Sequence, residues 1–135
     1  MLTKPAAERN LNAMESKAAY FITSDDDFIA ANRAREIFEE LSKDALDEMS
    51  KEVIDGSSQK AEDAEEAVLQ TLQAAATPPL FGGRKFVWLR NANFFGDSKI
   101  LKNGGVASAL GKLAEYLKTL SADSAAVVIS ASPVD

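Results

Sequence analysis

The sequence predicts an α/β fold in which a parallel sheet of about four strands carries helices on both faces. Short apolar runs alternate along the chain with longer segments whose apolar residues recur at helical spacing. The unbroken apolar run at residues 86–89 is typical of a strand buried on both sides, as in a parallel sheet. Because strands alternate with helices, right-handed crossover connections are expected.

The first part of the chain is predicted to form a helix, a buried strand and a second helix. A helix with proline in its first turn is expected over residues 5–17, followed by a strand over Ala19–Thr23. Ser24 and Asp27 have the spacing of a capping box, and the acidic residues Asp25, Asp26 and Asp27 suit the positive end of a helix. That helix is expected to continue to about Lys43.

The remaining elements follow the same alternation. Lys51–Asp55 is predicted to be a short strand near a sheet edge, because its two apolar residues have charged neighbours. Ser57-Ser58 offers a cap for a helix that ends at the prolines after residue 77. Residues 90–105 are predicted to be a loop on which Phe94-Phe95 packs down. A last helix over residues 106–120 and a buried strand over residues 125–129 complete the sheet.

Composition narrows the classes of function. The chain has 135 residues, of which 46% are apolar and 27% charged, as in one soluble globular domain. It contains no cysteine and no histidine, which removes thiolate chemistry and the commonest metal ligand and general base. We therefore expect no catalytic residue, no metal and no cofactor.

Charge and hydropathy argue against direct nucleic-acid binding and against a membrane-spanning helix. The formal net charge of −6 makes the domain a poor binder of nucleic-acid phosphates by itself. No stretch reaches the roughly 20 apolar residues of a membrane helix, and the first residues lack the apolar core of a signal peptide. A cytoplasmic protein is expected. Because the sequence ends on a strand, we expect it to be a piece of a longer protein.

The loops after the strands argue against nucleotide hydrolysis. A nucleotide site would place a glycine-rich loop and a lysine after the first strand, where this chain has three acidic residues. Asn91 after the third strand is a poor magnesium ligand. A receiver-like signalling domain with a degenerate phosphoacceptor site is the alternative, because Asp25, Asp27 and Ser130 suit it. However, neither Asn91 nor Asn93 can form an acyl phosphate.

Leu80 and Phe81 stand at a break between helix and strand. Pro78 and Pro79 cannot extend the helix, and Gly82-Gly83 allows the backbone to turn. The pair is either buried in the core or presented to a partner, and the residues alone leave both possibilities open.

The charged residues that bracket the third strand are expected to be solvated strand ends, namely Arg84, Lys85 and Arg90. Trp88 within that strand is expected to be a core residue.

Three segments in this order resemble one family: residues 20–28, 80–92 and 126–132. Over about residues 18–135 the chain resembles the N-terminal domain of the δ subunit of the bacterial DNA polymerase III clamp loader. In that family a hydrophobic strand ends in a small acidic cluster followed by Phe, at the place of a phosphate-binding loop. A Leu-Phe pair then precedes a short loop with Arg and a strand that ends in Asn-Ala.

The resemblance implies a truncated AAA+ or P-loop NTPase-like core that neither binds nor hydrolyses ATP, within the DNA polymerase III holoenzyme. It implies that residues 1–135 form one domain, which binds the sliding clamp (the β subunit) and favours an open ring during DNA replication. The clamp-binding pair of the family carries over to Leu80 and Phe81, beside Pro78 and Pro79. Pro78 stands where the family often has a larger apolar residue such as Met.

The resemblance also concerns the other partners. The C-terminal helical domains that join δ to the other clamp-loader subunits are missing from this sequence, and DNA is contacted only indirectly. The expected location is the replisome in the bacterial cytoplasm.

Overall fold

The computed structural model describes residues 18–24, 26–45 and 47–131. In chain order the main elements are β1 (Ala19–Thr23), α2 (Asp27–Leu41), β2 (Lys51–Asp55), α3 (Ala61–Ala76), β3 (Lys85–Arg90), α4 (Ser98–Leu101), α5 (Gly104–Thr119) and β4 (Ala125–Ala131). Short 3-10 helices occupy Ser42–Asp44, Glu48–Ser50 and Asn93–Gly96. The helix expected over residues 5–17 lies outside the described residues.

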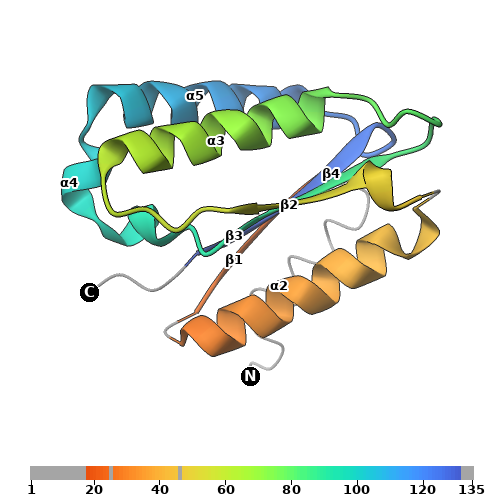
Figure 1. Ribbon diagram of the computed structural model, residues 1–135, viewed down its shortest axis with the longest axis horizontal. Coiled ribbons are helices and arrows are strands. Elements are labelled where there is room, and N and C mark those ends of the chain that lie inside the picture. Colours follow the sequence, from red (N-terminus) through yellow and green to blue (C-terminus); the bar gives the residue numbers. More distant parts are fainter. Residues whose placement is uncertain (1–17, 25, 46, 132–135) are drawn as a thin grey trace.

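The strands form one four-stranded sheet in the order β1-β4-β3-β2, and every pair of neighbours is parallel. Figure 1 shows the sheet nearly on edge, with α3 and α5 side by side on one face and α2 on the other. The predicted fold class is confirmed. β2 is an edge strand, as its charged residues indicated.

The central strands β4 and β3 carry apolar residues on both faces because each face of the sheet packs against helices. In β3, Val87 and Leu89 join the cluster beneath α3 and α5, whereas Phe86 and Trp88 join the cluster above α2. Successive side chains of a strand point to opposite faces, so an unbroken apolar run fills both layers. Trp88 is a core residue, as predicted.

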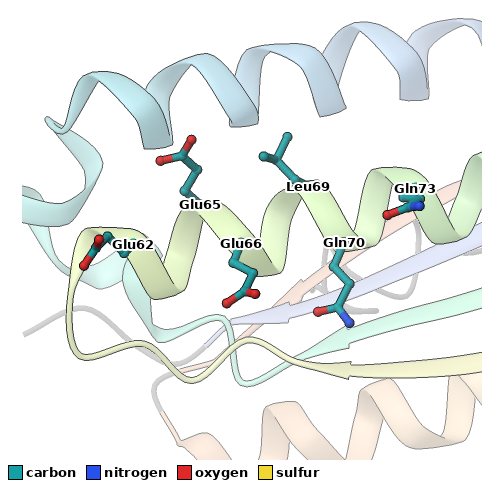
Figure 2. Close-up of a pocket in the computed structure, with 6 residues that line it drawn as sticks. All are labelled: Glu62, Glu65, Glu66, Leu69, Gln70 and Gln73. Atoms are coloured by element: carbon teal, nitrogen blue, oxygen red, sulfur yellow. The ribbon is translucent and has the colours of Figure 1, made fainter.

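The helix α3 has an apolar stripe and an acidic outer face. Ala64, Val68 and Ala75 are buried, in agreement with the helical spacing. The outer face carries a shallow hollow of about 500 Å³, and the described residues that line it all belong to α3. Figure 2 shows them: Glu62, Glu65, Glu66, Leu69, Gln70 and Gln73. A Cβ on Gly105 would collide with the carboxylate of Glu65, which therefore lies against the N-terminus of α5, where negative charge is favourable.

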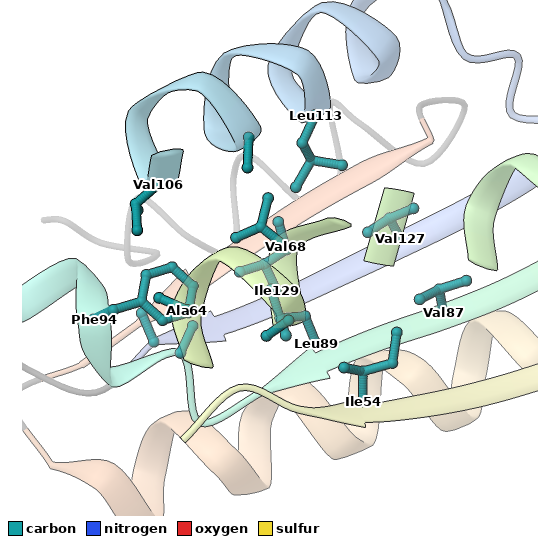
Figure 3. Packing of buried hydrophobic residues seen from close by; sticks show 14 of the residues in the cluster. Ile54, Ala64, Val68, Val87, Leu89, Phe94, Val106, Leu113, Val127 and Ile129 are labelled. Carbon is teal, nitrogen blue, oxygen red and sulfur yellow. The ribbon is translucent and has the colours of Figure 1, made fainter. Parts of the chain in front are cut away.

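The larger apolar cluster fills the layer between the sheet and the helices α3 and α5 (Figure 3). Val68 from α3 and Leu113 from α5 lie there with Val127 and Ile129 from β4. The cluster on the other face contains residues of α2 and of β1, β3 and β4. In the described part of the chain, the first face is thus covered by two long helices and the second by one.

The connection between β3 and α5 differs from its prediction as a loop. It contains the 3-10 helix Asn93–Gly96 and the single-turn helix α4, both too short to show a helical period in the sequence. Phe94 is fully buried and Phe95 partly buried, so the expected packing of these aromatic residues is confirmed.

The predicted cap of α3 was wrong. The helix begins three residues after Ser57-Ser58, and neither serine caps it. Instead, the carboxylate of Asp63 accepts hydrogen bonds from the backbone N–H groups of Gln59 (3.2 Å) and Lys60 (3.3 Å). An acidic side chain in the first turn can satisfy N–H groups that precede the helix, so a serine cap is not needed.

None of the helices in the described ranges has the length and apolar character needed to span a membrane.

Candidate protein-interaction site

A tight turn at the end of α3 presents Leu80 and Phe81. The N–H of Gly82 donates to the carbonyl of Pro79 at 3.3 Å, so Leu80 and Phe81 are the two central residues of the turn. Their exposed fractions are 73% for Leu80 and 66% for Phe81. Gly82 and Gly83 follow with φ angles of 81° and 84°, which glycine adopts without strain.

The approach to this turn is restricted. Thr77 ends α3: its N–H donates to the carbonyl of Ala74 at 3.3 Å, and its hydroxyl donates to the carbonyl of Gln73 at 2.7 Å. Pro78 and Pro79 follow, and their rings fix φ. The chain therefore has little backbone freedom where it leaves α3 and enters the loop that carries the apolar pair.

Of the two environments left open for Leu80 and Phe81, the structure shows the exposed one. Neither side chain belongs to a buried cluster. The turn lies at the end of the sheet where the strands begin, on the right in Figure 1. Adjacent large apolar side chains that remain in solvent are typical of a surface that binds another protein.

The prediction that Lys85 is a solvated strand end was wrong. Its exposed fraction is 5%, its Nζ donates to the carbonyl of Ala74 at 2.9 Å, and the same Nζ lies 3.4 Å from the carboxylate of Glu52. Lys85 shares a sheet face with Val87 and Leu89, which are both buried. This two-residue period was present in the sequence and could have predicted the burial of Lys85.

The other two charged residues that bracket β3 differ from Lys85 and from each other. Arg90 is exposed, as predicted. Arg84 is half-buried, and its guanidinium lies 5.0 Å from the centre of the Phe86 ring.

At the opposite end of the sheet, Asp26 caps α2. Its carboxylate accepts hydrogen bonds from the backbone N–H groups of Phe28 (2.8 Å) and Ile29 (3.4 Å). N–H groups at a helix N-terminus have no partner within the helix, and in phosphate-binding loops they donate hydrogen bonds to the nucleotide. In this domain a side chain of the protein itself occupies them.

The capping box predicted for Ser24 and Asp27 is corrected by this arrangement. The hydroxyl of Ser24 accepts from the N–H of Asp26 at 3.2 Å and does not reach the helix. Because α2 begins at Asp27, the residue directly before it is the cap. The expectation that the acidic residues cap the helix is confirmed for Asp26, whereas Asp25 and the side chain of Asp27 lie outside the described residues.

The loops that follow β2 and β3 are joined by a side chain. Asn93 accepts from the N–H of Ser58 at 2.8 Å and donates to the carbonyl of the same residue at 3.0 Å. Asn91, just before it, has a φ of 56°, which few residues other than glycine and asparagine adopt. Asn91, which the sequence indicated to be a poor magnesium ligand, and Asn93, which cannot form an acyl phosphate, both contribute to the backbone structure here.

Asp55 at the end of β2 also hydrogen-bonds within its own loop. Its carboxylate accepts from the N–H of Ser57 at 3.0 Å. The hydrogen bonds from the backbone and hydroxyl of Ser57 lower the pKa of Asp55 from its usual value, and the charge of Arg90 adds to this effect against the opposing effect of partial burial.

The described residues contain no group of three or more carboxylate, histidine or cysteine side chains placed to hold a metal ion. The hollow on α3 has several acidic residues, but the described part of the chain gives it no second wall. Small-molecule sites usually enclose most of their ligand, so we assign no ligand to this hollow.

The strand order contradicts the receiver alternative. Receiver domains have the order 2-1-3-4-5, in which the first strand lies between the second and the third. Here β1 pairs with β4. Ser130, the residue that suited this alternative, is buried in β4, where its hydroxyl accepts from the indole N–H of Trp88 at 3.0 Å.

A parallel α/β domain with an exposed apolar turn fits a protein-binding module. Residues 20–135 match the family described as DNA polymerase III, delta subunit. The chain therefore belongs to this family, as the N-terminal domain of the subunit, and the family is a component of the clamp loader of DNA polymerase III. The comparisons with curated proteins and with solved structures gave no match.

Proposed function

We propose that this domain binds the DNA sliding clamp through Leu80 and Phe81, with Pro78 and Pro79 at the border of the contact, and helps to open the clamp for loading. The observation that carries the proposal is the exposure of an adjacent Leu and Phe on a restricted turn. A sliding clamp is the partner that a clamp-loader subunit must recognise, so family membership supports this choice.

The size of the apolar pair is sufficient to anchor such a contact. Complete burial of a Leu or Phe side chain contributes about 1.5–3 kcal/mol, so the pair contributes roughly 3–6 kcal/mol. Because Pro78 and Pro79 restrict the backbone before the pair, part of the cost of ordering the loop on binding is avoided. Opening of the ring further requires that the domain bind the open clamp more tightly than the closed clamp.

We further propose that the domain is a degenerate AAA+-like unit without ATPase activity. The N–H groups of Phe28 and Ile29 already donate hydrogen bonds to the carboxylate of Asp26, and its negative charge repels a phosphate. Titration of the domain with ATP and Mg²⁺ is expected to release no heat of binding, and a saturable signal would contradict this part of the proposal.

In this proposal residues 1–135 are a single N-terminal domain of a longer subunit in the bacterial cytoplasm. Assembly with the other clamp-loader subunits then depends on helical domains beyond this sequence. The net charge of −6 supports indirect contact with DNA, since a domain that neutralises phosphates needs a basic surface.

The experiment is surface plasmon resonance of the domain on an immobilised cognate sliding clamp. The double variant Leu80→Ala with Phe81→Ala is expected to weaken binding by roughly 100-fold to 10,000-fold, which corresponds to the free energy of the two side chains. Its melting temperature is expected to stay near that of the parent, because both side chains are exposed.

The chain offers a matched control at the other end of the sheet. Phe28 and Ile29 are also an adjacent, exposed aromatic and aliphatic pair. The double variant Phe28→Ala with Ile29→Ala removes similar apolar surface and should leave clamp binding unchanged. Equal losses in both double variants would contradict a specific role for Leu80 and Phe81, and so would full binding by the Leu80/Phe81 variant.

A further inference from the structure

The loop that carries Leu80 and Phe81 is flanked by two stems, namely the last turn of α3 and the start of β3. The side chain of Lys85 joins these two stems. The loop leaves the C-terminus of α3 and enters β3 at Lys85. The ammonium of Lys85 donates to the carbonyl of Ala74, in the last turn of α3, and contacts the carboxylate of Glu52 on β2. This one group thus connects the helix before the loop, the strand after it and the edge strand beside that strand.

The bond to Ala74 matters because carbonyl groups at a helix C-terminus have no partner within the helix. A positive charge at this end is also favourable to the helix dipole. The same carbonyl accepts the N–H of Thr77, so the end of the helix and the start of the loop meet at the atom that Lys85 holds. With an exposed fraction of 5%, Lys85 is buried on the sheet face that also carries the buried residues Val87 and Leu89.

The loop itself contains few other restraints. Within residues 77–84, the backbone N–H groups that form hydrogen bonds to other backbone groups are those of Thr77 at the start and of Gly82 in the turn. Gly82 and Gly83 allow the part after Phe81 to take other directions. The direction in which the apolar pair points is therefore determined mainly by the two stems.

We infer that Lys85 is a positioning residue for clamp binding: it does not touch the clamp but holds the stems so that Leu80 and Phe81 are already placed for their pocket. This inference rests on the proposed function. Loss of Lys85 lowers the fraction of molecules in the binding-competent loop conformation, and the apparent affinity falls by that fraction. The bound complex keeps the same Leu and Phe contacts.

The kinetics of binding distinguish positioning from contact. Lys85→Met keeps an unbranched apolar stem of four atoms and removes the ammonium. We expect its association rate constant to fall by roughly 3-fold to 10-fold with little change in the dissociation rate constant. Truncation of Leu80 and Phe81 should instead raise the dissociation rate constant, as is usual for lost contacts.

Two variants complete the test. Lys51→Met removes the same charge from the same end of the sheet, where Lys51 pairs with Glu48 at 3.0 Å, and controls for electrostatic steering. Glu52→Gln loosens Lys85 from its half-exposed partner and should lower the association rate by less than Lys85→Met does. Because Glu52 is at the surface, this variant remains informative if Lys85→Met melts at a much lower temperature.

Several outcomes would overturn the inference. An unchanged association rate for folded Lys85→Met would do so, and so would an equal decrease in Lys51→Met. If Lys85→Met is unstable, an unchanged rate in Glu52→Gln would also reject it. Failure of the proposed function has a different signature, because the Leu80/Phe81 double variant would then bind like the parent.

Discussion

The two ends of the sheet differ in whether the side chains of their loops make contacts within the domain. At the end where the strands finish, polar side chains hydrogen-bond within the domain: Asp26 caps α2, and Asn93 holds Ser58. At the end where the strands begin, Leu80 and Phe81 extend into solvent without a place in the core. The end that usually binds ligands in α/β proteins is thus occupied by its own side chains.

This difference shows that stability and partner binding can be separated in one small domain. The polar side chains Asp26 and Asn93 at the carboxyl end of the sheet satisfy backbone groups, so their removal should destabilise the fold. Side chains of the exposed turn satisfy nothing inside the domain, so their removal should leave the fold unchanged. Mutations at the carboxyl end should therefore change the free energy of unfolding, whereas mutations in the exposed turn should change clamp affinity.

The largest effect on stability at the carboxyl end is expected from Asn93→Ala. This change removes both hydrogen bonds to Ser58 and leaves its backbone groups without that partner, at a cost of about 1–3 kcal/mol in the free energy of unfolding. Chemical denaturation measures this cost. Clamp affinity should not change, and a variant that binds less tightly without loss of stability would break the distinction between the two ends.

A smaller effect is expected at Asn91, whose φ of 56° is unfavourable for most side chains. Asn91→Ala should destabilise the domain by about 1 kcal/mol, because alanine lacks the local hydrogen bonding that helps asparagine adopt this conformation. Asn91→Gly should remain within about 0.5 kcal/mol of the parent, since glycine adopts positive φ freely. Equal denaturation midpoints for the two variants would show that the backbone has another conformation there.

The smallest effect is expected from Asp55→Asn, and it should depend on pH. The hydrogen bonds from Ser57 lower the pKa of Asp55 in the folded state, so the carboxylate stabilises the fold above its unfolded pKa of about 3.9. That contribution is lost as the pH falls through the lower folded pKa. The parent should therefore melt above the variant at pH 7, and the difference should shrink as the pH falls toward 2. A constant difference between these pH values would exclude the carboxylate as its source.

Most of the fold could be predicted because apolar periodicity reflects burial directly. β1 and β2 have the predicted bounds, and the helical stripe of α3 faces the core. The helix starts were less predictable, since serine and aspartate side chains compete for the same N–H groups. At α2 and α3 the aspartates make the hydrogen bonds, and the choice depends on backbone angles that spacing does not reveal.

The prolines and glycines around Leu80 and Phe81 indicated the position of the candidate site in the sequence. They did not indicate whether the two side chains are exposed or buried. Whether Leu80 turns inward depends on the space that α3 and β3 leave, which is a property of the packed molecule. Lys85 was missed for the opposite reason: its charge suggested solvent, whereas strand alternation placed it inside. A lysine can occupy such a position when a carbonyl and a carboxylate meet its ammonium.

The indole of Trp88 gives this domain a built-in spectroscopic reporter. It is the one tryptophan of the chain, it is buried on the α2 side of the sheet, and its ring centre lies 5.7 Å from that of Phe38. Its emission should therefore shift to longer wavelength only when α2 separates from the strands. Fluorescence of the free protein can then follow unfolding of the scaffold without a label, while leaving the solvent-facing Leu-Phe turn unperturbed.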